Sequence, residues 1–253
     1  MPSLSVILIV RDEAHVVVEC LESVRWADEI LVLDSGSRDG TPDLCRRFTP
    51  KVLETDWPGF GVQKNRALAQ ASGDWVLSLD ADERVTPALA GEIRAVISST
   101  AAAGFRIPFQ STYLGRPMRF GDWRDERHLR LFRREAGRFT PDPVHERLLV
   151  DGPIADLKER IIHHSFASLD EVLDKVNRYS SEAAQVRLAQ GRRGSLGSAI
   201  GHGAWTFLRG YLLRAGFLDG REGFLLALSN ALGSFYRYAK LAYLRQPGGP
   251  GCS

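Results

Sequence analysis

Two aspartates separated by a single residue, Asp80 and Asp82, directly follow an apolar segment over residues 75–79 that reads as a buried strand. Two carboxylates in this spacing on a loop can face one hard cation. Mg²⁺ and Mn²⁺ accept one or two protein carboxylates and complete their coordination with water and phosphate oxygens. The pattern therefore indicates a metal-assisted diphosphate site, although a short acidic pattern taken alone is more often a solvated turn.

Other acidic residues follow two further predicted strands. Asp12 and Glu13 come after the apolar run 4–10, and Asp34 comes after the run 29–33. In an open sheet of parallel strands, ligands bind beyond the carboxyl ends of the strands. We therefore expect these acids to line the same crevice as the aspartate pair.

Short apolar strands alternate with helix-like segments of about ten residues through the first hundred residues. Such alternation predicts right-handed crossovers and a mostly parallel sheet with helices on both faces. From residue 105 to residue 164, prolines interrupt short strand-like runs, which predicts antiparallel additions and long loops. The expected strands of the first part are 4–10, 29–33, 51–54 and 75–79, and the expected helices begin near Asp12 and Thr41 and cover 62–71 and 87–98.

The C-terminal part has a different character. A helical pattern over 169–188 and a linker over 191–194 precede two amphipathic helix candidates within 197–245, which carry nine aromatic residues. This tail has six basic and two acidic residues, a local charge of +4 that an anionic membrane surface attracts. Packing of the aromatic residues on the main domain is the alternative. We expect one domain over 1–190 and a helical, membrane-associating extension over 195–246.

The composition excludes several classes of protein. With 44% apolar and 25% charged residues, the chain has the make-up of an ordinary globular protein, and its net charge of +2 gives no reason to expect nucleic acid as a partner. Three cysteines without a CxxC pair argue against a zinc site or a disulfide framework. The N-terminal apolar run does not read as a signal peptide, and the uncharged C-terminal runs are too short to span a membrane, which predicts a cytoplasmic protein.

The sequence resembles the inverting GT-A glycosyltransferases of family 2, and among them the bacterial lipopolysaccharide-core glucosyltransferase type. The stretches that carry the resemblance are SVILIVRDEAHVVVECLESVRWADEILVLDSGSRDGT, DWPGFGVQKNRALAQASGDWVLSLDADERV, RLFRR, GRF, VHE, HHSF and YLLRAGFLDGREGF. The resemblance implies a GT-A, Rossmann-like α/β fold with a mostly parallel sheet, flanking helices and a C-terminal amphipathic helical extension. It also implies transfer of a hexose, with glucose expected, from a UDP-sugar with inversion to a saccharide acceptor. That acceptor is the lipopolysaccharide core or another lipid-linked glycan, at the inner face of the cytoplasmic membrane.

The same resemblance assigns roles to individual residues of this chain. Asp34 and Asp39 match the acidic loop that reads the uracil and the ribose of the sugar nucleotide. Asp80 and Asp82 match the Asp-x-Asp motif, whose Mg²⁺ or Mn²⁺ bridges the two phosphates. Asp82 is the expected metal ligand, together with His163, the first of two adjacent histidines. The residues expected beside the nucleotide are Asp12, Glu13, Asp34, Asp39, Lys64 and Asp80.

An inverting transfer needs a base that deprotonates the acceptor hydroxyl while its oxygen attacks the sugar. The resemblance places this base in a Val-His-Glu segment, which makes Glu146 the expected catalytic residue. Asp142 and His145 are the alternatives for the base. A purely structural Glu146 that pairs with Arg147 or Arg133 is the other possibility.

Two other functions are open at this point. A haloacid-dehalogenase-type phosphatase also places Asp-x-Asp after a buried strand, but it needs Thr or Val two residues after the second aspartate, where this chain has Arg84. A non-catalytic sugar-nucleotide-binding membrane adaptor is the third hypothesis, and Glu146 distinguishes it from an enzyme. Trp123, Arg124 and Asp125 are further candidates for contacts with sugar hydroxyls.

Overall fold

The computed structural model describes residues 2–141 and 146–244. Contacts within the chain group it into two compact units. The first unit is Met1–Gln110 with Asp125–His163, and the second is Ser111–Arg124 with His164–Ser253. The domain boundary expected near residue 190 falls inside the second unit, where the helix that ends at Ala189 groups with the two helices that follow it.

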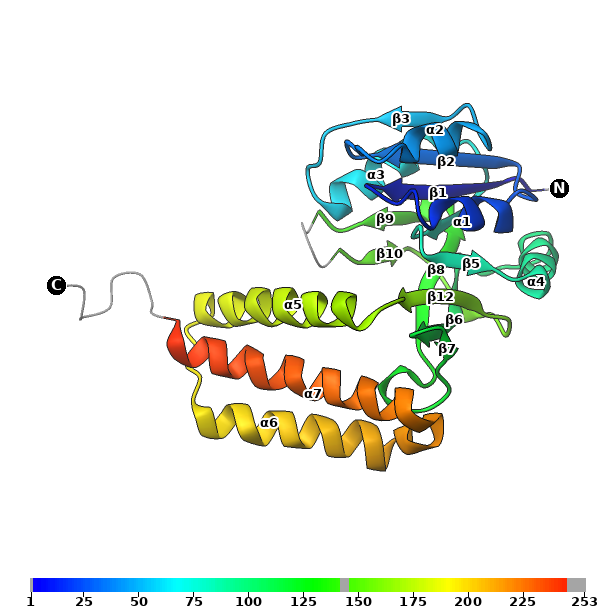
Figure 1. Cartoon of the computed structure of the whole chain (residues 1–253). Coiled ribbons are helices and arrows are strands. Elements are labelled where there is room, and N and C mark those ends of the chain that lie inside the picture. The colour runs from blue at the N-terminus through cyan, green and yellow to red at the C-terminus, as the bar shows by residue number, and fades with distance from the viewer. Residues whose placement is uncertain (1, 142–145, 245–253) are drawn as a thin grey trace. The chain divides into compact units, whose positions relative to one another are not determined.

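Figure 1 labels most of the helices and strands, which are numbered in chain order. The strands are β1 Leu4–Val10, β2 Glu29–Asp34, β3 Val52–Glu54, β4 Trp75–Leu79, β5 Glu83–Val85, β6 Gly104–Tyr113, β7 Arg116–Pro117, β8 Arg127–Arg133, β9 Gly137–Phe139, β10 Leu148–Val150, β11 Ile154–Asp156 and β12 Ile161–Phe166. The α-helices are α1 Val17–Ser23, α2 Thr41–Arg46, α3 Phe60–Gln70, α4 Pro87–Ile97, α5 Leu169–Ala189, α6 Leu196–Leu208 and α7 Gly220–Tyr243. Short helical turns are η1 Gly121–Trp123, η2 Arg134–Ala136, η3 Arg209–Leu213 and η4 Gly216–Asp219.

The main sheet is hydrogen-bonded in the order β3-β2-β1-β4-β8-β6-β12-β5, with β7 and β11 beside β6. Strands β3, β2, β1 and β4 run parallel, and β8 joins β4 in the antiparallel direction. The register pairs Val10 with Asp34 and Leu8 with Leu79, so β1, β2 and β4 end at the same edge of the sheet. The predicted mostly parallel α/β sheet and its antiparallel additions are confirmed.

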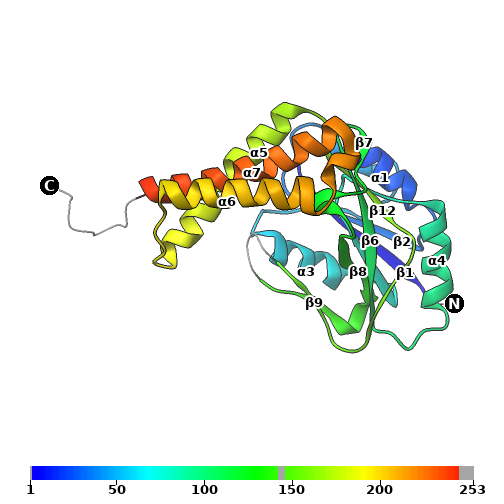
Figure 2. The same ribbon diagram turned by 90° about the horizontal axis from the view of Figure 1, so that it is seen from below.

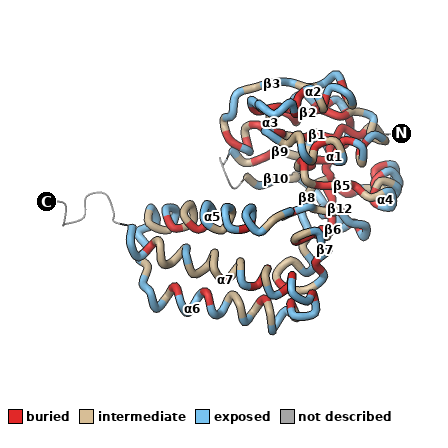
Figure 3. Tube along the Cα trace, in the orientation of Figure 1, coloured by how far each residue is buried: buried red, intermediate tan, exposed pale blue. Residues whose placement is uncertain are grey.

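Side chains alternate between the two faces of β1, which explains why helices cover both. Val6 and Leu8 point to one face and pack in a buried cluster with residues of α1, α2 and α4. Ile7 points to the other face and packs with Ala67 of α3 and Phe139 of β9. The buried positions of the first unit accordingly concentrate along its central strands (Figure 3). These two cores hold the ends of the parallel strands in fixed positions.

The expectation of a helix starting near Asp12 is wrong, because α1 begins only at Val17. Asp12 has a φ of +56°, in the left-handed region, and this turns the chain away from a helical path. Its backbone N–H donates to Ser37 Oγ at 2.9 Å, and that of Glu13 donates to Thr41 Oγ1 at 2.9 Å. The loop between β1 and α1 therefore bonds to the loop after β2 instead of starting a helix.

Helices α5, α6 and α7 form most of the second unit and lie side by side in both views (Figures 1 and 2). Gly203 lets α6 approach α7 closely, since a Cβ at this position would lie 3.1 Å from Phe235 Cβ and 3.3 Å from the carbonyl oxygen of Ala231. The two helices predicted for the C-terminal tail are thus present as α6 and α7. Among the described residues, no helix is both long enough and apolar enough to cross a membrane.

Candidate active site

Asp34 shapes the loop that follows β2. Its carboxylate is fully buried, and Oδ1 accepts hydrogen bonds from the backbone N–H groups of Gly36 and Ser37, each at 2.9 Å. The hydroxyl of Ser37 donates to the other oxygen, Oδ2. Gly36 has a φ of +86°, which a residue with a side chain rarely adopts. In the structure Asp34 therefore holds the backbone of the loop expected to read the uracil.

Asp12 and Asp39 connect that loop to the one after β1. Oδ1 of Asp12 accepts the N–H of Arg38 at 2.7 Å. Oδ2 of Asp39 accepts the N–H of Ala14 at 2.9 Å, and its Oδ1 accepts the hydroxyl of Thr41 at 2.5 Å. The hydrogen bond from Thr41, more than any other effect, lowers the pKa of the Asp39 carboxyl. Both aspartates are exposed, so this double loop also presents acidic groups to solvent at the edge where β1 and β2 end.

Asp80, at the end of β4, lies between two cations. Nη2 of Arg130 is 2.7 Å from its Oδ2, and Nζ of Lys64 is 3.6 Å from its Oδ1. Burial alone raises the pKa of the Asp80 carboxyl, but the charges of Arg130 and Lys64 reverse that effect and hold it well below its usual range. The aspartate is therefore ionised across the physiological range of pH.

Arg130 of β8 also pairs with Glu83, the first residue of β5. Glu83 is only 1% exposed, and its Oε2 accepts the N–H of Asp80 at 3.1 Å. Burial raises the pKa of Glu83 to about 7, although Arg130 opposes this effect. Glu83, held by Arg130, therefore fixes the turn that carries the Asp-x-Asp motif through its hydrogen bond with the backbone of Asp80. Arg130 also contacts the carboxylate of Asp80 directly.

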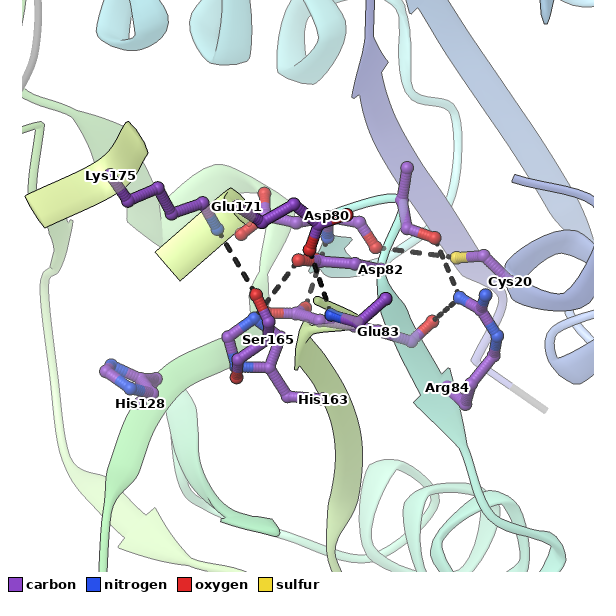
Figure 4. A network of polar contacts seen from close by, with 12 residues as sticks. Cys20, Asp80, Asp82, Glu83, Arg84, His128, His163, Ser165, Glu171 and Lys175 are labelled. Atoms are coloured by element: carbon purple, nitrogen blue, oxygen red, sulfur yellow. Dashed lines mark hydrogen bonds and ion pairs between the residues drawn. The ribbon is translucent and has the colours of Figure 1, made fainter. Parts of the chain in front are cut away.

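Arg84 and Cys20 hold the same turn from the side of α1 (Figure 4). The guanidinium of Arg84 donates to the carbonyl oxygens of Ala81 and Val16, each at 2.7 Å. Sγ of Cys20 donates to the carbonyl oxygen of Asp80 at 3.5 Å, and burial strongly raises the pKa of this thiol. A buried, protonated cysteine is a structural group here and not a nucleophile.

Lys64 and Glu146 are brought together by the fold. Nζ of Lys64 lies 2.8 Å from Oε1 of Glu146, and the two side chains are only 8% and 14% exposed. Lys64 is on α3, and Asn65 beside it anchors β9 by accepting the N–H of Phe139 at 2.9 Å and donating to its carbonyl oxygen at 2.8 Å. The expected base therefore faces a lysine that was expected beside the nucleotide.

A pocket of about 450 Å³ opens over this group of charges. Carboxylates and cations line it together with apolar side chains, so it can accept a ligand that carries both negative charge and hydroxyl groups. Its lining residues are Lys64, Asp80, His128, Leu129, Arg130, Phe139, Glu146, Arg147 and Leu148.

Asp82 and His163, the expected metal ligands, lie next to each other (Figure 4). Nε2 of His163 is 3.2 Å from Oδ2 of Asp82. Burial lowers the pKa of His163, but the hydrogen bond with Asp82 outweighs it and the net shift is upward. Among the described residues, no group of three or more His, Cys, Asp or Glu side chains is arranged to hold a metal ion. One carboxylate and one imidazole still fit a cation that takes its remaining ligands from phosphate and water.

The remaining sequence candidates lie elsewhere. Asp142 and His145, the alternatives for the base, lie outside the described residues. Trp123 belongs to the second unit, where its ring stacks on Phe166 with a centroid distance of 6.1 Å.

Sequence reasoning missed Arg130 and Glu83 altogether. The available signal was Arg130 itself, which lies between two leucines of a strand-like run. A charged side chain in such a run needs an acidic partner when it is buried.

Two solved structures share the fold of this chain. The S. aureus TarS fragment 1–349 in complex with UDP-GlcNAc is 17% identical, with a TM-score of 0.51 over 92% of this chain and 80% of that chain. Mannosyltransferase PcManGT from Pyrobaculum calidifontis, in complex with GDP-Man and Mn²⁺, is 20% identical, with a TM-score of 0.51 over 92% of this chain and 74% of that chain. At this level of identity, the likeness establishes the GT-A-like fold.

Sequence relatives extend over almost the whole chain. Lipopolysaccharide core biosynthesis glycosyltransferase LpsC of Rhizobium meliloti is 30% identical over 249 residues, which are 95% of this chain and 92% of the relative. An uncharacterized glycosyltransferase of Rickettsia felis is 29% identical over 95% of this chain and 90% of its own length. The family model for glycosyl transferase family 2 matches residues 5–148, more than half of the chain. Sequence and fold thus agree, and the chain belongs to glycosyl transferase family 2.

Proposed function

We propose that the protein transfers a hexose, with glucose expected, from a UDP-sugar with inversion to a saccharide acceptor of the lipopolysaccharide core or another lipid-linked glycan. The observation that carries this proposal is the convergence of Lys64, Asp80 and Glu146 on one pocket. The pocket combines a cation for a diphosphate with a carboxylate for an acceptor hydroxyl. A transferase needs both, whereas a binding adaptor needs only the first.

The nucleotide side of the proposed site is the double loop after β1 and β2. Asp12, Glu13, Asp34 and Asp39 would hold the uridine, with Asp34 acting through the loop that it shapes. Support comes from the two proteins of the same fold that were solved with UDP-GlcNAc and with GDP-Man. Lys64 and Asp80 would then face the diphosphate.

Asp82 and His163 would hold Mg²⁺ or Mn²⁺, and PcManGT, which shares the fold, was solved with Mn²⁺. The ion, when bound, supplies positive charge that offsets the charge building on the diphosphate as the glycosidic bond breaks. Arg130 keeps Asp80 ionised, while Glu83 and Arg84 hold the turn that carries both aspartates.

Glu146 would accept the proton of the acceptor hydroxyl as that oxygen attacks the anomeric carbon. In a single displacement the attacking oxygen approaches opposite the leaving diphosphate, which gives inversion. Lys64 lies between the base and Asp80, so it can hold the carboxylate of Glu146 in place until the acceptor binds.

We base the proposed acceptor on a sequence relative, and the proposed location on the surface of the second unit. LpsC of Rhizobium meliloti is named for lipopolysaccharide core biosynthesis. Helix α6 and the turn after it expose large apolar side chains next to arginines in the sequence. Leu208, Leu212 and Leu213, for example, are 44%, 51% and 69% exposed. Such a surface suits peripheral attachment to the inner face of the cytoplasmic membrane.

A thermal-shift titration with UDP, UDP-glucose and other UDP-sugars, with and without Mn²⁺, tests donor and metal together. A ligand at about one hundred times its Kd stabilises the native state by about 2.7 kcal/mol, enough to raise the Tm by several degrees. We expect Asp82→Ala to lose the Mn²⁺-dependent part of the shift and the transferase activity, and Asp43→Ala, at an exposed aspartate of α2, to lose neither. Full activity of Asp82→Ala in the presence of a chelator would remove the metal role, and NMR of the product anomer tests inversion.

A further inference from the structure

A second pocket, of about 480 Å³, lies entirely within the second unit, which we call the helical unit because α5, α6 and α7 form most of it. Helices α6 and α7 and the turns η1 and η3 contribute to it, and its charged residues are Asp122 from η1, Arg209 from the start of η3, Arg214 directly after η3, and Arg237 from α7. None of these residues belongs to the sites described above. The convergence of three arginines on one cavity is a feature that packing alone does not require.

One acidic side chain serves two of these arginines. Oδ1 of Asp122 lies 3.1 Å from Nη2 of Arg209 and 2.9 Å from Nη1 of Arg214. Its other oxygen receives a long hydrogen bond of 3.4 Å from Asn230. Asp122 is only 12% exposed and lies against Gly210, where a Cβ would come within 3.0 Å of Oδ2. The carboxylate therefore positions two guanidinium groups but neutralises only one charge.

The third arginine has an unused donor. Nε of Arg237 is buried and has no hydrogen-bond partner among the described residues, and the same is true of Nε of Arg209. A buried donor without a partner costs free energy. Three guanidinium groups against one carboxylate leave two positive charges on the wall of the pocket.

Aromatic rings also line the pocket, beside the polar side chains of Thr206, Asn230 and Ser234. Trp205 is 54% exposed, and the rings of His202 and Tyr238 stack with their centroids 4.0 Å apart. Exposed rings beside charged donors suit a ligand that has both a flat apolar face and an anionic group, as a sugar phosphate does.

We propose that this pocket binds a phosphate monoester. Guanidinium groups match phosphate oxygens with two parallel hydrogen bonds, and a phosphate monoester carries close to two negative charges, equal to the two surplus positive charges here. A carboxylate ligand would leave one of these charges unmatched. The phosphate belongs either to a phosphorylated sugar of the acceptor or to a lipid headgroup, and both present the same group to the arginines. The pocket shares no lining residue with the pocket that holds Lys64 and Glu146, and phosphate binding to it can be measured without sugar transfer.

The test measures binding to the full chain, by calorimetry in a phosphate-free buffer, of inorganic phosphate, glucose 6-phosphate and phosphatidylcholine vesicles with and without phosphatidic acid. Arg237→Gln and Arg214→Gln should each raise the Kd by about tenfold or more, because each removes a charge-assisted contact. Arg193→Gln is the matched control, since it makes the same charge change at an exposed linker position of the same unit. Arg237→Lys keeps the charge but not the paired N–H donors of the guanidinium, so it should weaken binding by less than Arg237→Gln. Thermal unfolding of every variant checks that it is folded.

The probes also identify the source of the phosphate. Tighter binding of glucose 6-phosphate than of inorganic phosphate, without a preference for phosphatidic acid, supports the pocket and assigns it to a sugar phosphate. Binding to vesicles that depends on phosphatidic acid and on Arg237 supports it and assigns it to a lipid headgroup. Absence of binding to every probe, or equal weakening by Arg193→Gln and Arg237→Gln, overturns the inference.

Discussion

Replacing Glu146 with Gln separates the proposed chemistry from donor binding. The substitution keeps the size of the side chain and an oxygen that can still accept from Nζ of Lys64, 2.8 Å away in the parent protein. It removes the carboxylate that would take the proton of the acceptor. A general base contributes about 10² to 10⁴ in rate, so we expect kcat to fall by that factor, equivalent to about 2.7 to 5.5 kcal/mol.

The same substitution should not weaken the donor. At 2.8 Å two unit charges attract by roughly 6 kcal/mol with an effective dielectric constant of about 20, and desolvation offsets much of this attraction. Without that attraction, Lys64 faces Asp80 alone, 3.6 Å away, and its charge is freer to meet a diphosphate. We therefore expect the Kd for the UDP-sugar to stay the same or to fall, while turnover collapses.

The assay is acceptor-dependent release of UDP at saturating donor and acceptor, which gives kcat, alongside a separate titration of the donor. Glu135→Gln is the control, because that glutamate is 88% exposed and its one ion pair within the described part of the chain is with Arg134 at 3.5 Å. A variant at position 146 that keeps kcat within about threefold of the parent would show that Glu146 is not the base. If the variant instead loses affinity for the donor and keeps kcat, Glu146 contributes to donor binding and not to proton transfer.

Three further predictions concern the framework of the molecule. Arg130→Met leaves the buried carboxylate of Glu83 without its cation, so we expect the free energy of unfolding in urea to fall by about 3–5 kcal/mol, and a loss below about 1 kcal/mol would contradict the network. The pKa of Glu29 is lowered from 4.5 to about 2, because bonds from a lysine and two serines outweigh the opposing effect of burial. Its stabilisation, about 3 kcal/mol, is complete above pH 4.5 and should be lost as the pH falls towards 2, and urea unfolding at several pH values should show a smaller decline in Glu29→Gln. Gly223→Ala should destabilise by about 1–3 kcal/mol or more, because its Cβ would lie 2.0 Å from a backbone carbonyl oxygen, whereas Gly233→Ala in the same helix meets nothing within 4 Å and should be neutral or stabilising in thermal unfolding.

Much of the first unit could be predicted from local pattern. The run that becomes β4, five buried residues followed by Asp80, shows both the strand and the position of the acid at its end. Alternation of strands and helices then predicts which edge of the sheet holds the site, because parallel strands joined by helices must end together. The helix expected at Asp12 failed because its backbone donors find partners 25 and 28 residues further along the chain, which a local pattern does not show.

The sequence by itself determined the first four strands, most of the helices, the family and the acidic turn after β4, since each is expressed by neighbouring residues. Tertiary structure decided which charges meet. Arg130 reaches Asp80 across 50 positions of the chain, and Lys64 reaches Glu146 across 82, because the order of strands in the sheet and the packing of α3 bring them together. The arginine pocket of the helical unit has the same origin, since Asp122 and Arg214 are 92 residues apart. The strength of an ion pair depends on distance in space and on burial, and neither quantity is written in the spacing of residues along the chain.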